Sequence, residues 1–310
     1  MTECLNTEKT ETKVAFSDLD LSPTILKNLE KAGFETPTDI QSNSIPFILE
    51  KRDVTAQAKT GSGKTLAFCL PAIQHIESGD TGAALVLVPT RELAEQVAGE
   101  FQRFGKGSKN LKVACVIGKQ SYSVQIRAIN HGANAVIATP GRLIDLLESG
   151  KIKNFSPDML VLDEADEMLN MGFIDDIKKV FKYLPEERQT VFFSATFPPQ
   201  IKKLAQDSQR NPAGVYLNNG KERQDNELIE QSFYVVSERE REAALVRLIE
   251  FERPEKAVVF CRTKRDVDEL QSRLMGKGIK AKALHGDMGQ IERKDILIIF
   301  SYSGNTSELS

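Results

Sequence analysis

Cysteine and histidine are scarce in this chain, and neither is clustered. The 310 residues contain four cysteines and three histidines, and no two cysteines form a Cys-x-x-Cys pair. Scattered thiols without ligand spacing exclude a disulfide framework and predict no zinc site. We therefore expect a protein of a reducing compartment, the cytoplasm.

Long apolar runs and an excess of positive charge are also lacking. No stretch approaches the ~20 consecutive apolar residues that cross a bilayer, and the polar residues 1–13 do not resemble a signal peptide. We therefore expect no membrane partner. The formal net charge of -3 excludes a polycationic coat that holds nucleic acid by bulk charge. Any nucleic-acid site must be local and built from a few placed donors.

What the chain does have is an alternation of apolar runs and helical patterns. Hydrophobic residues make up 40% and charged residues 27%, as in soluble globular proteins. Apolar strands that alternate with amphipathic helices predict an α/β fold, a parallel sheet with helices on both faces. In the first part, strands are expected at 53–58, 83–89, 112–118, 134–140, 158–166 and 188–196, and helices at 16–31, 64–76, 91–104, 121–129, 141–149 and 173–184.

A polar stretch divides the chain into two expected domains. Residues 219–228 have the composition of a linker between a first α/β domain, 43–218, and a second one, 229–310. In the second domain, strands are expected at 229–236, 256–263 and 281–286, and helices at 238–252, 265–278 and from Gly289 onward.

The sharpest motif lies between an expected strand and an expected helix. It departs from the strict phosphate-loop pattern only in starting with Ala58 instead of glycine. Gly61 and Gly63 let backbone amides turn toward phosphates, and the following helix directs its positive end at them. A lysine here can reach the β and γ phosphates, and the next threonine can hold Mg²⁺. The candidate nucleotide-binding residues are Ala58, Lys59, Thr60, Gly61, Ser62, Gly63, Lys64 and Thr65.

Two carboxylates directly follow another apolar run. Asp163 is placed to orient Mg²⁺ through its water shell, and Glu164 is the natural choice to orient or deprotonate an attacking water. The alternative is a capping pair at the start of a helix. Together with Lys64, these two acids are the candidate catalytic residues, and Thr65 and Asp163 are the candidate metal ligands.

An ordered set of further motifs resembles the DEAD-box RNA helicase family. Residues 163–166 read Asp-Glu-Ala-Asp, the tetrapeptide of that family. The resemblance runs from about residue 14 to about residue 293 and marks 14–42 as a Q-motif region. The other motifs of the set are GFETPTDIQ (33–41) with Phe16 upstream, PTRELA (89–94), TPGR (139–142), SAT (194–196), VVFCRT (258–263), HGD (285–287), Gln290 and Arg293.

The resemblance implies two RecA-like domains that bind ATP with Mg²⁺. The amide of Gln41 would pair with the adenine edge, Phe16 would stack on the base, and the backbone near Thr36 would support the same contact. Phe16 as a plain core anchor is the open alternative. Ser194 and Thr196 would couple the nucleotide to RNA binding, or would hydrogen-bond Asp166 as a structural latch, and the two roles are compatible.

The resemblance also implies RNA as the partner of a monomeric protein. The contacts would go to the RNA backbone and read no sequence, and RNA would be told from DNA by its 2′-hydroxyls and shape. One departure is Lys119, which stands where the family has the second glycine of a pair; its side chain would alter the RNA grip or add a phosphate contact. The implied RNA-binding residues are Pro89, Thr90, Arg91, Gly118, Thr139, Gly141, Arg142 and Arg293.

Two segments of the family's second domain do not occur in this sequence, so that domain is expected to be incomplete. One of them supplies arginines to the γ-phosphate, and such arginines are worth roughly 10³ to 10⁵ in rate. We therefore expect these 310 residues to bind ATP, to hydrolyse it slowly and not to unwind duplexes. The leading hypothesis is an ATP-dependent RNA helicase that opens duplexes locally. The alternatives are a DNA helicase of the wider superfamily and a non-catalytic fragment that binds ATP and RNA.

Overall fold

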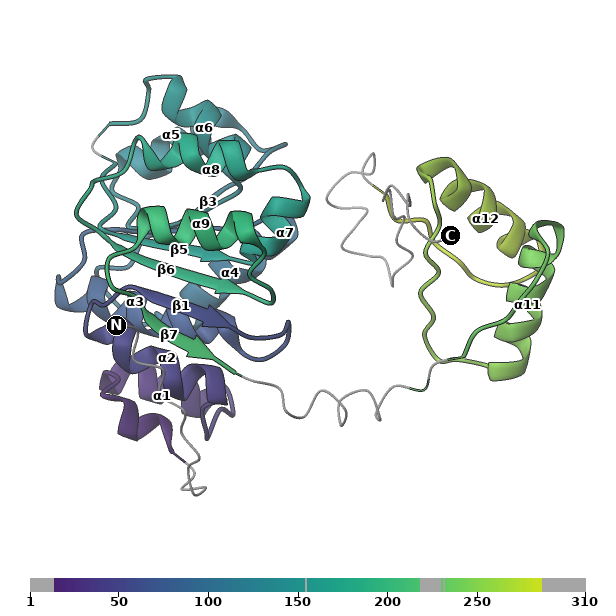
Figure 1. Ribbon diagram of the computed structural model, residues 1–310, viewed down its shortest axis with the longest axis horizontal. Coiled ribbons are helices and arrows are strands. Elements are labelled where there is room, and N and C mark those ends of the chain that lie inside the picture. Colours follow the sequence, from purple (N-terminus) through teal and green to yellow (C-terminus); the bar gives the residue numbers. More distant parts are fainter. Residues whose placement is uncertain (1–13, 154, 218–229, 231, 286–310) are drawn as a thin grey trace. The chain divides into compact units, whose positions relative to one another are not determined.

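The chain forms two compact units, which divide between Gly220 and Lys221. The computed structural model describes residues 14–153, 155–217, 230 and 232–285 (Figure 1). The first unit contains a seven-stranded sheet covered by helices. In its described part, the second unit contains helical elements and extended segments. No helix in either described part is both long and apolar enough to cross a bilayer.

The sheet of the first unit is parallel throughout. Its strands lie in the order β3-β4-β2-β5-β6-β1-β7, and each neighbouring pair runs in the same direction. Parallel strands need a crossover between them, and here helices supply it. The strands are β1 (Val54–Gln57), β2 (Ala84–Leu87), β3 (Val113–Val116), β4 (Ala135–Ala138), β5 (Met159–Asp163), β6 (Gln189–Ser194) and β7 (Ala213–Tyr216).

Helices cover both faces of this sheet, and each face has its own hydrophobic core. Successive strand residues alternate between the two cores, so Val86 of β2 packs on one face and Leu85 and Leu87 on the other. One face packs against α1 (Pro23–Lys31), α2 (Asp39–Leu49), α3 (Lys64–Ser78) and α4 (Arg91–Phe104). The other packs against α5 (Tyr122–Asn130), α6 (Pro140–Glu148), α7 (Ala165–Asn170), α8 (Ile174–Phe181) and α9 (Pro199–Ser208).

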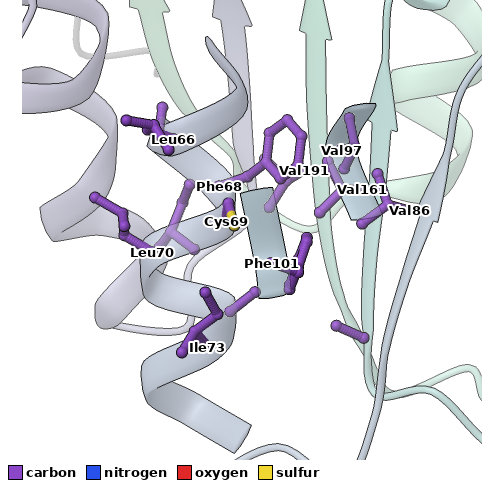
Figure 2. Close-up of a cluster of buried hydrophobic side chains, with 14 of the residues drawn as sticks. Leu66, Phe68, Cys69, Leu70, Ile73, Val86, Val97, Phe101, Val161 and Val191 are labelled. Carbon is purple, nitrogen blue, oxygen red and sulfur yellow. The ribbon is translucent and has the colours of Figure 1, made fainter. Parts of the chain in front are cut away.

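The core beneath α3 and α4 shows why the strands are nearly continuous runs of apolar residues. Figure 2 shows Phe68 of α3 and Phe101 of α4 packed near Val86, Val161 and Val191 from three strands. All five side chains are fully buried. Because both faces are covered, every position of β2, β4, β5 and β6 is buried, which removes the polar alternation of a half-exposed sheet. The predicted α/β fold is confirmed.

The single helix predicted at 16–31 is wrong, because the chain breaks in the middle of it. A 3-10 helix, η1 (Phe16–Leu19), is followed by Asp20 in the left-handed region, with φ at 52°. A new helix then begins, with Ser22 accepting a hydrogen bond from the backbone of Ile25 and Pro23 in the first turn. A serine cap followed by proline is a strong helix start, and it outweighs the continuous apolar pattern.

The second unit matches its predicted helices but not its predicted strands. Its helical elements are η2 (Glu238–Glu240), α11 (Arg241–Glu252) and α12 (Lys264–Gly276). Apart from an isolated bridge at Cys261, the described residues of 229–236, 256–263 and 281–286 form no strand. A strand requires a partner backbone along its length, and an isolated bridge does not provide one. The helix predicted from Gly289 onward lies outside the described residues.

Candidate functional site

The predicted motifs of the first unit meet at one edge of the sheet. Because all strands are parallel, their carboxyl ends lie at the same edge, where α/β sheets bind ligands. Asp163 and Ser194 are the last residues of β5 and β6. Just beyond the ends of the other strands come residues 58–63 after β1, 89–91 after β2, Gly118 after β3 and Thr139 after β4.

The phosphate loop joins β1 to α3 and depends on glycine at two positions. Gly61 and Gly63 have φ of 81° and 92°, which a residue with a side chain rarely adopts. Gly63 also caps α3, and a Cβ atom there would lie 2.5 Å from Nε2 of Gln41. Since α3 starts at Lys64, its first amides carry the positive end of the helix dipole toward this loop.

Two opposite charges are buried beside this loop. Lys64 is 6% exposed and Asp163 is 2% exposed. Nζ of Lys64 makes no hydrogen bond to any described residue, and neither does the buried hydroxyl of Ser62. Burial raises the pKa of Asp163 to about 7, against the attraction of Lys64. Unpaired buried polar groups are costly, so this site fits a ligand that brings anionic oxygens to Lys64 and a cation to Asp163, as a triphosphate with Mg²⁺ would.

Glu164 is held in a strained backbone conformation next to Asp163. Its φ is 54°, a left-handed value that costs a residue with a side chain roughly 1–2 kcal/mol, and its amide donates to Oδ1 of Asp163 at 3.0 Å. Burial raises the pKa of Glu164, and Lys64 opposes the rise. Such strain at a cluster of buried charges is typical of a functional site.

The Q-motif residues connect to the phosphate loop through Gln41. Its Oε1 accepts from the backbone of Thr38 at 2.9 Å, and its Nε2 donates to the carbonyl of Gly63 at 3.0 Å. Gln41 is buried, and its role in recognising adenine stays a prediction. Phe16 is buried in the core, which agrees with the core-anchor interpretation, while its stacking role stays a prediction. Thr36 is exposed.

The SAT and DEAD segments form a compact hydrogen-bonded latch. Oδ2 of Asp166 accepts from the backbone of Thr196 at 2.9 Å and from its hydroxyl at 2.8 Å, and the backbone of Asp166 donates to Oγ of Ser194 at 3.1 Å. Burial raises the pKa of Asp166, but the hydrogen bonds from Thr196 and Ser194 outweigh it, so the pKa lies below its ordinary value. This geometry is that of the structural latch, and a coupling role stays a prediction.

Sequence reasoning did not identify Gln57, which ties the phosphate loop to this latch. Its Nε2 donates to the carbonyl of Ala195 at 3.1 Å, and the backbone of Ala58 donates to the carbonyl of Ser194 at 3.1 Å. A glutamine at the end of a buried strand is a signal that could have been used, because a polar side chain there needs a partner.

Arg91 and Gly118 are brought into contact by the loops after β2 and β3. A Cβ atom on Gly118 would lie 3.2 Å from the guanidinium of Arg91, so glycine here makes room for that side chain. Lys119 follows with φ at 63°. At the position where the family has its second glycine, the backbone is therefore left-handed. Lys119 adopts this conformation at a cost in free energy, which a glycine would avoid. Thr90 caps α4 by accepting from the backbone of Leu93 at 3.2 Å.

Arg142, another predicted RNA-binding residue, is held by contacts with three residues. It donates to Oε1 of Gln125 at 3.0 Å and to the carbonyl of Gln120 at 2.6 Å, and its guanidinium lies 3.3 Å from the ring centre of Tyr122. Of the other members of this set, Pro89 is buried, Thr139 and Gly141 are half-buried around the start of α6, and Arg293 lies outside the described residues.

Both parts of the chain match family models. The DEAD/DEAH box helicase model matches residues 38–204, and the helicase conserved C-terminal domain model matches residues 240–309. The chain is also similar to a solved DEAD box protein from the hyperthermophile Methanococcus jannaschii. The two are 40% identical with a TM-score of 0.62, over 93% of this chain and 79% of that one.

Curated relatives include two bacterial helicases. The DEAD-box ATP-dependent RNA helicase RhpA of Helicobacter pylori is 46% identical over 288 residues, which cover 93% of this chain and 58% of that protein. The DEAD-box ATP-dependent RNA helicase CshA of Streptococcus pneumoniae is 44% identical over 295 residues, which cover 95% of this chain and 56% of that protein. The chain thus spans a little over half the length of these relatives. As its motifs predicted, it belongs to the DEAD-box family of ATP-dependent RNA helicases.

Proposed function

We propose that this chain, as a monomer, binds ATP with Mg²⁺ and the backbone of RNA, and serves an activity that couples ATP hydrolysis to local opening of RNA duplexes. The proposal rests on membership of the helicase family and on the chemistry of the site. Its domains would be a Q-motif region at 14–42, an ATP-binding RecA-like domain at 43–218, a linker at 219–228 and a second RecA-like domain at 229–310.

The observation that carries the nucleotide proposal is the buried pair Lys64 and Asp163. An ammonium group without a hydrogen-bond partner in the described structure is suited to the β and γ phosphate oxygens, which would supply its missing acceptors. Thr65 and Asp163 would hold Mg²⁺, whose charge neutralises the phosphate oxygens. The loop residues 58–63 would contribute backbone amides, as the left-handed conformations of Gly61 and Gly63 favour.

Glu164 is the proposed base for the attacking water. A general base works best when its pKa lies close to the working pH, and burial shifts the pKa of Glu164 in that direction. Its backbone is held in the left-handed conformation beside Asp163, to which its amide donates. The role of Asp163 requires the ionised form, which a neighbouring cation would favour by lowering its raised pKa.

RNA would bind at the same edge of the sheet, through the loops that follow β2, β3 and β4. The helices α4 and α6 begin there, and free amides at helix starts bind phosphates. Arg91 and Arg142 add guanidinium donors to the same region. These groups recognise phosphate and sugar rather than bases, so binding would be largely independent of sequence.

The nucleotide proposal is tested by titrating the purified chain with ATP in the presence of Mg²⁺. We expect saturable binding that Lys64→Ala weakens by at least about tenfold, since it removes a charge-assisted contact. Lys203→Ala, at an exposed position on α9, is the matched control and should bind as the parent does. A folded chain without affinity for adenine nucleotides would contradict the proposal.

Two further measurements separate the alternatives. Competition between RNA and DNA strands of the same sequence, with ATP bound, distinguishes an RNA helicase from a DNA helicase. We expect the chain to bind the RNA strand more tightly than the DNA strand. Steady-state ATP turnover with saturating RNA distinguishes a catalytic chain from a non-catalytic fragment. For these 310 residues, slow turnover stays our prediction, and a rate typical of whole helicases would contradict it.

A further inference from the structure

Gln125 is a buried polar residue that belongs to none of the recognised motifs. It lies on α5, close to the end of β3, and is 3% exposed. Its Nε2 donates to the carbonyl of Ile117 at 2.9 Å, and its Oε1 accepts from Nε of Arg142 at 3.0 Å. Both ends of the amide are therefore committed, as burial requires. One side chain thus connects the loop after β3 to the first turn of α6.

Through Arg142 this connection extends to the rest of the loop. The guanidinium also donates through Nη2 to the carbonyl of Gln120 and stacks on the ring of Tyr122. Tyr122 in turn donates through its hydroxyl to Asp145 of α6 at 3.2 Å. The loop between β3 and α5 is therefore attached to α6 at several points, and the guanidinium of Arg142 lies at the centre of them.

These contacts leave one edge of the guanidinium available. The hydrogen bonds to Gln125 and Gln120 use Nε and one hydrogen of Nη2. The N–H groups of Nη1 and the other hydrogen of Nη2 form the opposite edge, which suits bidentate contact with a phosphate. A free arginine side chain has large rotamer entropy, so holding the Nε edge fixes where the phosphate-binding edge can lie.

We propose that Gln125 is a positioning residue of the RNA site, which orients Arg142 for contact with an RNA phosphate and holds the loop after β3 against α6. This inference rests on the proposed RNA binding. Gln125 would touch no RNA itself. Its contribution would pass entirely through Arg142, and this distinguishes the proposal from a general structural role for a buried glutamine.

A double-mutant cycle tests this dependence. The affinity of the chain for an oligouridylate of about ten nucleotides is measured with a non-hydrolysable ATP analogue for the parent, Gln125→Met, Arg142→Ala and the double variant. We expect Gln125→Met to weaken binding about tenfold, as loss of a charge-assisted contact does, and to have little further effect once Arg142 is absent. Gln102→Met, at an exposed position of α4, is the control and should bind normally.

Salt dependence gives a readout that a structural defect would not produce. Losing one phosphate contact on a single strand should reduce the slope of log affinity against log salt by about 0.7, in Gln125→Met as in Arg142→Ala. Full additivity in the cycle, an unchanged affinity of Gln125→Met, or an unchanged salt slope would each overturn the proposal.

A measurement without RNA keeps the proposal testable if the chain proves not to bind RNA. The Nε–H resonance of Arg142, assigned with Arg142→Lys, should be protected from solvent exchange in the parent and lose protection in Gln125→Met. If the Nε–H group of Arg142 stays equally protected in Gln125→Met, the positioning role is rejected. If the parent chain does not bind RNA, the proposed function is rejected, whatever the Nε–H measurement shows.

Discussion

The two units carry similar sequence patterns but differ in how those patterns are used. In the first unit, apolar runs became strands whose side chains are almost all fully buried between two layers of helices. In the second unit, Phe233 and Val235 lie in a run that predicted a strand, yet they are 90% and 92% exposed. The small core that the structure describes there is centred on Val267 and Ala283.

This difference shows that an apolar run specifies a strand only when partner strands are available. A β-strand leaves its backbone donors and acceptors unsatisfied until neighbours pair with them. Helices satisfy their own backbone groups, so α11 and α12 form from local sequence. Thr263 begins α12 by accepting from the backbone of Asp266 at 3.1 Å, and Asp266 accepts from the backbone of Thr263 in return. Local capping of this kind needs no tertiary partner.

The largest expected effect contrasts a buried and an exposed aromatic residue of the two units. Phe192→Ala, in β6 of the first unit, should destabilise that unit by about 3–5 kcal/mol, because it leaves a cavity in a dense core. Phe251→Ala in α11, where the ring is mostly exposed, should change stability by less than about 0.5 kcal/mol. Urea unfolding followed for each unit measures both values. Similar losses at the two sites would remove the contrast.

A second effect concerns pH and is confined to the first unit. Because the pKa of Asp163 is about 7 in the folded chain and its ordinary value is 3.8, the folded state holds a proton that the unfolded state has released between these pH values. Stability should therefore fall as pH rises from about 4 to about 7 and then level off. Asp163→Asn should remove this dependence and stabilise the unliganded first unit at pH 8 by up to about 4 kcal/mol.

Thermal unfolding of the parent and Asp163→Asn across that pH range measures the effect. A variant that is no more stable than the parent at pH 8 would contradict the burial of an ionised Asp163. The second unit, whose helices lie far from Asp163 in sequence, serves as an internal control and should show no difference between the two proteins.

A smaller effect should appear in the second unit when its helix cap is removed. Thr263→Ala deletes the hydroxyl that accepts from the backbone of Asp266 and should destabilise α12 by about 1 kcal/mol. Hydrogen exchange of the α12 amides should accelerate, while exchange in α3 stays the same. Serine at this position should restore the protection, and failure of Thr263→Ser to do so would argue against capping.

The smallest effect is a gain in stability at the departure from the family glycine pair. Lys119→Gly removes the strain of a left-handed backbone at a residue with a side chain. It should stabilise the first unit by about 1 kcal/mol or slightly less, because the contacts of the lysine side chain are lost at the same time. The melting temperature of the first unit measures this gain. If RNA affinity falls in the same variant, the lysine side chain contributes to the RNA grip.

The sequence predicted what depends on local pattern and on motif chemistry. Six of the seven strands of the first unit and most of its helices could be predicted from apolar periodicity, whereas β7 was missed. The Lys64 loop and the Asp163 segment could be predicted from their residue types. The order of the strands could not, because it depends on how the crossovers pack. The break at Asp20 was hidden because the apolar pattern continues across it.

Side chains that act through buried hydrogen bonds were also beyond sequence reasoning. Gln125 lies on an amphipathic helix, where a polar residue is expected to face solvent, and only the position of α6 reveals its contact with Arg142. The Gln41 side chain makes two hydrogen bonds, one with the backbone of Thr38 and one with the carbonyl of Gly63. They could not be predicted for the same reason. Such residues become visible only when segments far apart in sequence are brought together.

The most direct measurement compares hydrogen exchange in the two units with and without ATP and Mg²⁺. If Lys64 and Asp163 hold the nucleotide, a ligand concentration of about 100 times Kd should raise the free energy of opening in α3 by up to about 2.7 kcal/mol. At the same ligand concentration, Lys64→Ala should reduce this gain to about 1.4 kcal/mol or less, because its affinity is at least about tenfold weaker, and α12 should remain unaffected. Protection of α3 that does not change with ATP, or that changes equally in Lys64→Ala, would contradict a nucleotide site built on this buried pair.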